Sequence, residues 1–387
     1  MWAILTSAAG LCPRKSPMWF LSKTTATPRA TPVNDGTASF VSFGGRVFAT
    51  DNQAPTAITR LPILRVSKIA VSMGLAVGVT EQGIIRFHGT ARPSLLKVNK
   101  QADVRVDASS VTKLVCDGGC AAVLASGSLF VTGANRDYQL GLGHDRPVDQ
   151  LVRVDFDDVH DVCLGHDRMA LVTSQSKCFV VGSNRRGRLG LGPDVIHART
   201  LTPLGFPIHA AVTAPTCTLF LAQRKIVMLA GDVSHSCIKA YMPGGHNVYV
   251  TPAPLQFPWP VLGLYVCPQD GSMVAKRADT QTWYSISAAG LGSGDDGFSG
   301  LQWKELSGID VTEVFEGEMV GSTWVKCKDG SLFAFGHNAG VGLGVGSRQP
   351  LVSKPCMVTE PVVLPEPMQL WEMSPGLTPL TVTACLG

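Results

Sequence analysis

The chain has 387 residues, of which 45% are hydrophobic and only 16% charged, and its formal net charge is +4. With 41 Gly and 25 Pro, this composition argues against disorder and against a coiled coil, and it favours short buried strands joined by tight turns. The small basic excess is scattered, so it does not indicate a nucleic-acid-binding protein. Charged residues interrupt every long apolar run, which argues against a membrane-spanning helix.

The first 34 residues contain no acidic residue. Their basic residues are Arg14, Lys15, Lys23 and Arg29. This composition fits a mitochondrial transit peptide, although a disordered tail, or upstream sequence before a true start at Met18, would fit too. We therefore predict an N-terminal extension over residues 1–37 and a mitochondrial location, with the cytoplasm or nucleus as alternatives.

Three segments share the pattern G-x-N-x-x-x-x-L-G-x-G without a gap. They begin at Gly133, Gly182 and Gly336, so the first two lie 49 residues apart and the third lies close to three further periods away. The fixed repeat positions are Gly133, Leu140 and Gly141, then Gly182, Leu189 and Gly190, then Gly336, Leu343 and Gly344. A period of this size predicts a repeat fold in a single domain.

Each pattern follows a short apolar run with a turn residue in front of it, which is typical of a buried strand. Two further apolar runs precede each one, and a weaker strand follows the last glycines. The unit is therefore a four-stranded sheet, which we interpret as a blade of an all-β, seven-bladed β-propeller over residues 38–387. Six or eight blades remain alternatives, because the fifth and sixth copies are degenerate. The third strands are expected to begin near Gly45, Gly83, Gly127, Ser176, Lys225, Gln281 and Gly330.

The first blade is incomplete at its front, because residues 45–50 lack the usual upstream strands. We expect the C-terminal runs 369–373 and 378–383 to supply them. Pairing the two ends of the chain in one sheet would close the ring and leave no free edge.

The pattern resembles the repeat of the regulator-of-chromosome-condensation family, and the period extends the resemblance to roughly residues 38–387. The founding member of that family is a guanine-nucleotide exchange factor for a small nuclear GTPase. Other members act in ubiquitin-ligase targeting, ciliary transport or mitochondrial translation. The resemblance therefore implies a binding surface and leaves the partner open.

One departure from the family concerns the loop between the first two strands, where repeats commonly carry Gly-x-x-His. The comparable positions here are Gly119 or Cys120, Arg168, Cys217 and Leu75. This loss argues against exchange by the founding member's mechanism.

Two charged groups are candidate contact residues. Asp117, His166, Asp167 and Arg168 fall on the expected loop face, with structural roles as the alternative. Arg136, Arg185, Arg186 and Arg188 follow the repeat glycines and could form a basic rim, with solvated turn residues as the alternative.

No catalytic residues, cofactor or metal site are predicted. Cys116 and Cys120, with His166, lack the spacing of a zinc site. The 11 Cys lie mostly in apolar runs and are interpreted as buried thiols.

Three functions fit the sequence. The first is a non-catalytic protein-interaction propeller acting as scaffold or regulator, the second an exchange factor for a small GTPase, and the third a mitochondrial RNA- or ribosome-associated assembly factor. We favour the first and expect a monomer with a protein partner.

Overall fold

The computed structural model folds into two compact units. One contains the sheets between residues 66 and 254, and the other contains the sheets of residues 261–372 and most of the first sheet. The residues described are 31–34, 38–43, 46–51, 54–60, 66–72, 75–80, 85–89, 106–117, 119–222, 226–234, 236–266, 272–286, 303–316, 322–338, 343–359 and 371–372.

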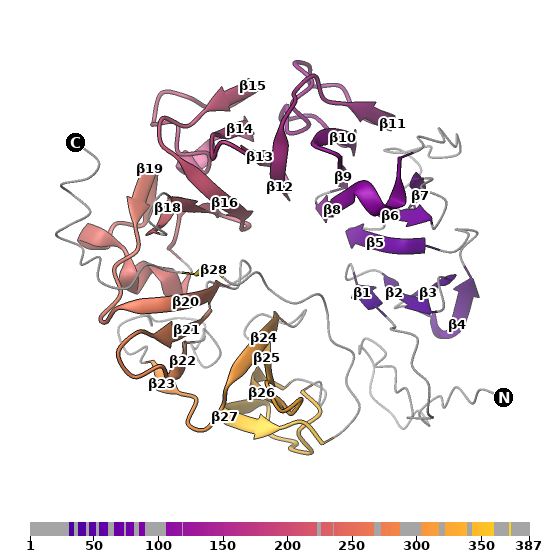
Figure 1. Cartoon of the computed structure of the whole chain (residues 1–387). Coiled ribbons are helices and arrows are strands. Elements are labelled where there is room, and N and C mark those ends of the chain that lie inside the picture. Colours follow the sequence, from indigo (N-terminus) through magenta and orange to yellow (C-terminus); the bar gives the residue numbers. More distant parts are fainter. Residues whose placement is uncertain are drawn as a thin grey trace. The chain divides into compact units, whose positions relative to one another are not determined.

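Four antiparallel sheets build the first of these units (Figure 1). The three-stranded sheet has β5 (Val66–Ser72), β6 (Leu75–Thr80) and β7 (Ile85–Gly89). The next has β8 (Val111–Asp117), β9 (Cys120–Ala125), β10 (Ser128–Gly133) and β11 (Val148–Arg153). The third has β12 (Val159–Gly165), β13 (Arg168–Thr173), β14 (Cys178–Ser183) and β15 (His197–Pro203). The fourth has β16 (Ile208–Thr213), β17 (Cys217–Ala222), β18 (Ile226–Asp232) and β19 (Val248–Pro254).

Three sheets account for the other described strands. One has β1 (Thr31–Asn34), β2 (Ala38–Phe43), β3 (Arg46–Asp51) and β4 (Ala54–Arg60). The second has β20 (Val261–Val266), β21 (Met273–Arg277), β22 (Trp283–Ile286), β23 (Lys304–Glu305) and β28 (Trp371–Glu372). The third has β24 (Val311–Glu316), β25 (Ser322–Cys327), β26 (Leu332–His337) and β27 (Leu351–Met357).

The seven predicted third strands are all confirmed within the described residues. They are β3, β7, β10, β14, β18, β22 and β26, and each is the third strand of its sheet along the chain. The prediction succeeded because a turn residue, an apolar run and a closing small residue are local features that any sheet context must preserve.

The second strands are the most buried. Every residue of β9, β13 and β17 is buried, because each of these strands lies between two others in its sheet and packs against a neighbouring sheet. One cluster joins Leu124 and Leu129 to Leu171, and another joins Val172 to Phe220. A fully buried side chain of this size contributes about 1.5–3 kcal/mol relative to an exposed one. Face-to-face packing of successive sheets therefore forms the core of this unit.

The expected closure through residues 369–373 is not observed. In the structure Trp371 and Glu372 pair with Leu264 and Gly263 of β20. Instead, β1 and β2 supply the first two strands of the first sheet, and β1 pairs antiparallel with β2. The first sheet thus begins at Thr31, inside the segment assigned to the extension, while residues 378–383 lie outside the described part of the chain.

Candidate interaction site

The site begins at a glycine that ends the third strand of each well-formed sheet. Gly133, Gly182 and Gly231 have φ values of +115°, +110° and +120°. A Cβ at Gly182 would lie 2.5 Å from the Asp167 carbonyl oxygen and 2.6 Å from the Arg168 Cα. Only glycine fits there, because the loop between the first and second strands passes directly against it.

Strand register identifies the residue that faces each glycine. Cys120, Arg168 and Cys217 are the cross-strand partners of Gly133, Gly182 and Gly231, respectively. The register therefore selects Cys120 over Gly119 for the position where family repeats carry histidine. In the sheets of β6 and β25 the corresponding residues are Leu75 and Ser322.

A buried asparagine organises the turns that follow Gly133, Gly182 and Gly336. In the β14–β15 connection, Asn184 accepts the backbone N–H of Leu189 at 2.8 Å and donates to the carbonyl oxygens of Gly192 and Val195 at 3.0 and 2.7 Å. Asn135 and Asn338 accept the N–H of Leu140 and Leu343 in the same way. The pattern N-x-x-x-x-L is thus one side-chain-bridged turn whose leucine enters the core.

Arg168 is a buried link between two sheets. Its side chain is 1% exposed. The guanidinium donates to Asp167 at 2.8 Å, to Thr218 Oγ1 at 3.0 Å and to the Cys217 carbonyl oxygen at 2.7 Å, and also to the carbonyl oxygen of Ala214. Burial lowers the pKa of Arg168, and the adjacent Asp167 carboxylate opposes that shift. The charge is therefore neutralised inside the protein.

Asp167 is shared between two arginines. Its second oxygen accepts a hydrogen bond from Arg188 at 2.8 Å. Arg188 itself is mostly buried, with 21% of its side chain exposed. Both residues were candidate contact residues. In the structure their charged groups link the β12–β13 loop to the β14–β15 connection of the same sheet, and Asp167 also holds Arg168, which reaches the next sheet.

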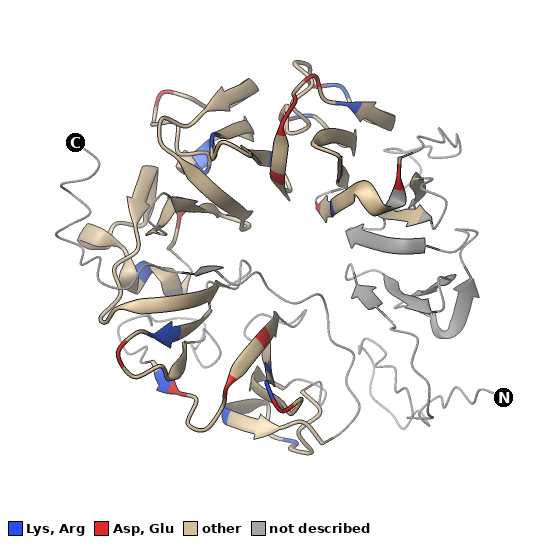
Figure 2. Cartoon of the chain, viewed as in Figure 1, with Lys and Arg blue, Asp and Glu red and all other residues tan. Residues whose placement is uncertain are grey.

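The other candidates differ in exposure. Asp117 is half-buried at the end of β8, and His166 is exposed. Arg136 and Arg185 are exposed, and Arg186, which is 61% exposed, also pairs with Asp232. Figure 2 colours the turn between β14 and β15 blue; in this turn Arg185 and Arg186 follow Asn184.

Gln139 links two sheets on the loop face, and the sequence interpretation missed it. It is 3% exposed, accepts the backbone N–H of Asp137 at 3.0 Å, and reaches the His166 carbonyl oxygen at 3.4 Å. Its place in the repeat is that of Arg188, one residue before the buried leucine. A comparison of the copies at that position could have identified both side chains as links on this face.

Comparisons with known proteins complete this picture. No family model matches the chain, and no curated protein sequence matches it. Among solved structures, yeast RCC1 (Prp20) bound to Kap60 matches with a TM-score of 0.58 and 11% identity, over 80% of this chain and 79% of that one. Prp20p from Saccharomyces cerevisiae matches with a TM-score of 0.57 and 12% identity, over 83% and 85%. Human WBSCR16 matches with a TM-score of 0.56 and 17% identity, over 85% and 92%.

The chain has the fold of an RCC1-type β-propeller. The expected resemblance is therefore confirmed at the level of fold, and identities this low leave activity to be argued from the site. Within this propeller the histidine position of family repeats holds Leu75, Cys120, Arg168, Cys217 and Ser322, none of which is histidine.

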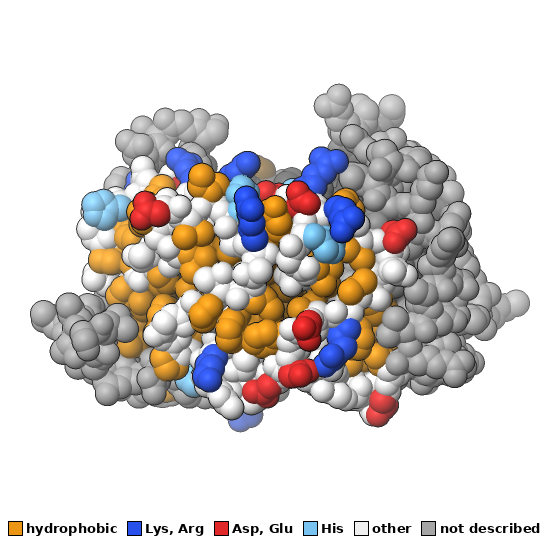
Figure 3. Space-filling view, turned by 90° about the horizontal axis from the view of Figure 1, so that it is seen from above, with side chains coloured by type: hydrophobic (Ala, Val, Ile, Leu, Met, Phe, Trp, Pro, Cys, Tyr) orange, Lys and Arg blue, Asp and Glu red, His pale blue; other side chains and the backbone are white. Residues whose placement is uncertain are grey.

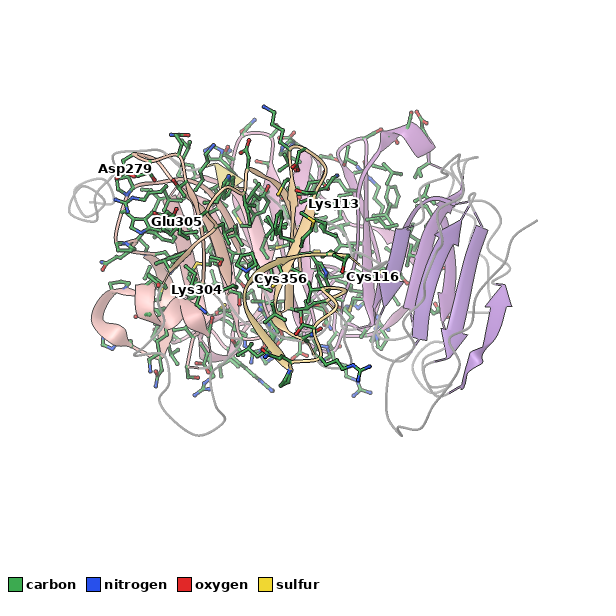
Figure 4. The ribbon with its side chains drawn as sticks, turned by 90° about the horizontal axis from the view of Figure 1, so that it is seen from below. Lys113, Cys116, Asp279, Lys304, Glu305 and Cys356 are labelled. Atoms are coloured by element: carbon green, nitrogen blue, oxygen red, sulfur yellow. The ribbon has the colours of Figure 1, made fainter. Side chains whose placement is uncertain are left out.

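The cysteines of the propeller are mostly buried and free. Cys120, Cys163, Cys178, Cys217 and Cys327 are buried, while Cys116 is half-buried and Cys356 is exposed. Figure 4 labels Cys116 on β8 and Cys356 on β27. Burial raises the pKa of Cys163 to about 11 and those of Cys120 and Cys217 to about 12. These thiols therefore stay protonated at neutral pH, which makes them poor nucleophiles.

The residues that the structure describes contain no group of three His, Cys, Asp or Glu side chains placed to hold a metal ion. Their helices are also too short or too polar to cross a lipid bilayer.

Proposed function

We propose that the chain is a protein-binding propeller that acts as a scaffold or regulator without catalysing a covalent reaction. The observation that carries this proposal is that some charged side chains of the loop face make structural bonds while others are exposed. Asp167 and Arg188 link two loops of one sheet, Arg168 links that sheet to the next, and exposed His166 and Arg185 adjoin them in sequence. A rigid face with exposed polar tips binds at low entropic cost, because its side chains are already held in place.

The comparison with yeast Prp20 supports a protein partner. That protein is bound to Kap60 in one structure, and another reports its binding to Gsp1p and histones. The test is cross-linking of the tagged full-length chain in its native cell, followed by partner identification. Recovery of a protein in stoichiometric amount is expected, and its absence at every cross-linker length would overturn the proposal.

Guanine-nucleotide exchange is the second candidate, favoured by the likeness to Prp20, whose binding to Gsp1p was measured. Such a protein would work by binding the nucleotide-free GTPase more tightly than the loaded form. Cross-strand pairing with the repeat glycines is made by Cys120, Arg168 and Cys217, where family repeats carry histidine. This difference argues against the exchange mechanism of the family's founding member. We expect no faster release of a fluorescent guanine nucleotide from small GTPases of the same cell, and an acceleration of tenfold or more would establish the exchange role instead.

We also propose that the seven sheets are the blades of one closed propeller. The support is the common register, in which Gly133, Gly182, Gly231 and Gly336 pair with the first residues of the fourth strand in four sheets. Electron-microscopic class averages should show a seven-fold ring. An open arc, or a different number of blades, would contradict this arrangement.

Mitochondrial targeting remains a proposal that rests on the acid-free N-terminal sequence. The expected mature protein from mitochondria begins downstream of Arg14. An intact Met1 on the purified native protein would remove this proposal and leave the binding function untouched.

A further inference from the structure

Two neighbouring turns present arginine side chains on a fixed backbone. Arg136 and Arg185 directly follow the buried residues Asn135 and Asn184, and both arginines are exposed. Each asparagine is held by the hydrogen bonds that close its turn, so the arginine next to it starts from a defined position. Little backbone freedom would be lost when such a side chain binds a partner.

Strand β15 connects the two turns into one surface. Its first residue, His197, lies 3.3 Å from the Asp137 carboxylate in the first turn and pairs with Ser183 at the start of the second. Two residues further on, the Arg199 guanidinium lies 5.5 Å from the centroid of the Tyr138 ring. We call this the arginine surface; its members are Arg136, Tyr138, Arg185, Arg186 and Arg199. Figure 3 shows lysine and arginine side chains along the upper edge of this face, with acidic and histidine side chains among them, above a band of hydrophobic ones.

Two residues of the arginine surface adopt left-handed backbone conformations. Tyr138 has φ +65° and Arg186 has φ +56°, a region that costs about 1 kcal/mol or more for residues other than glycine. Side-chain contacts hold both in place, since Arg199 lies over the Tyr138 ring and Arg186 pairs with Asp232. These contacts fix the backbone from which the neighbouring arginines project.

The charges of the arginine surface are unbalanced at its exposed tips. Asp232 is paired with Arg186, while Asp137 lies 3.3 Å from the His197 ring, which offsets its charge only when the ring is protonated. Arg136 and Arg185 remain to meet an external anion. Exposed Asp145 and Asp194 lie later in the same two connections, and exposed Arg146 follows Asp145, so charges of both signs border the arginine surface in sequence.

We infer that the arginine surface binds a short acidic segment, with clustered Asp or Glu side chains, of the protein partner assigned under the proposed function. The planar guanidinium group matches a carboxylate through paired hydrogen bonds. A nucleic-acid strand fits less well, because the connections that carry the arginines also hold exposed Asp145 and Asp194, which would repel its regularly spaced phosphates. The inference rests on the proposed function and specifies the chemistry of its partner.

Fluorescence anisotropy with a labelled deca-glutamate peptide at low salt tests this inference. The full-length chain should bind the peptide, and the double variant Arg136→Glu with Arg185→Glu should weaken binding about tenfold or more. Lys177→Glu is the matched control: Lys177 is exposed and precedes β14, at the end of the strand opposite to Arg185. It should leave binding unchanged. Since all three residues are exposed, thermal melts of the variants should match the parent.

A labelled ten-nucleotide oligouridine provides the competing outcome. The inference is overturned if the oligouridine binds more tightly than deca-glutamate. It is also overturned if the arginine double variant and the Lys177→Glu control lower the affinity for deca-glutamate equally. The cross-linking experiment separates this result from the proposed function. A partner captured equally by the parent and the double variant would preserve the binding role and reject the acidic contact.

Discussion

Replacing Arg168 by Met isolates the contribution of a buried guanidinium between two sheets. Methionine keeps most of the aliphatic volume, so the change removes mainly the hydrogen bonds and the charge. Asp167 would retain Arg188, and the Cys217 carbonyl oxygen would retain the backbone N–H of Ala214 at 2.9 Å. The Ala214 carbonyl oxygen would lose its bond to the guanidinium.

The expected loss of unfolding free energy is about 3–5 kcal/mol. One buried carbonyl without a partner costs about 1–3 kcal/mol, and hydrogen bonds to a charged group are worth about 1.5–3 kcal/mol. Lys113→Met is the comparison, because Lys113 also joins neighbouring sheets, through Asp161 at 2.5 Å, but is 34% exposed; Figure 4 labels it. Solvent screening limits that pair to about 1 kcal/mol or less.

Urea unfolding followed by circular dichroism measures both changes as shifts of the midpoint at constant slope. Arg168→Lys keeps one charge but loses the fork, so its midpoint should fall between those of the parent and Arg168→Met, and it provides the measurement if the methionine variant does not fold. If Arg168→Met lowers stability no more than Lys113→Met does, the guanidinium is not an inter-sheet link and the reasoning fails.

Three other outcomes are expected. Gly182→Ala should lower the free energy of unfolding by more than about 2 kcal/mol, since its Cβ would meet the backbone at 2.5 Å. Gly192→Ala, with φ +86° and open space around it, should lower it by about 1 kcal/mol. Equal shifts of the two melting temperatures would contradict the close approach at Gly182. Asn184→Ala should cost about 2–3 kcal/mol because it removes the partner of one buried and two partly buried backbone groups, and Asn184→Asp should recover only part in the same melt. At pH 8 the raised pKa of Cys163 keeps its thiol protonated, so iodoacetamide should label exposed Cys356 first by peptide mass spectrometry; equal labelling rates in the folded protein would refute the burial argument, and denaturation should remove the difference.

The sequence was sufficient to locate strands where the determinants are local. A run such as Leu129–Val131 between turn glycines forms a strand in any copy of the repeat. Closure of the first sheet depends instead on which distant segment reaches an open edge, and β1 lacks the glycine pattern of the repeats. Nothing local in residues 31–34 distinguishes them from the acid-free segment before them.

The sequence predicted where the site residues lie better than what their side chains do. Arg168 was expected on the loop face, and it does begin β13 there. Its burial could not be inferred from its charge, since arginine is rarely buried without partners, and those partners come from Thr218 and the loop of the next sheet. The alignment with Cys120 and Cys217, which are both buried, was the available indication that this position faces inward.

The connection between β18 and β19 has a practical consequence for work on this protein. It holds the short helical turns Cys237–Tyr241 and Pro243–Gly245, yet Gly231 still pairs with Tyr249 as in the other sheets. Gly244 and Gly245 are exposed, and a Cβ at Gly245 would meet nothing within 4 Å. An epitope tag or a fluorescent reporter spliced between these two glycines should leave the strands on both sides paired, which offers a labelling position away from the ends of the chain.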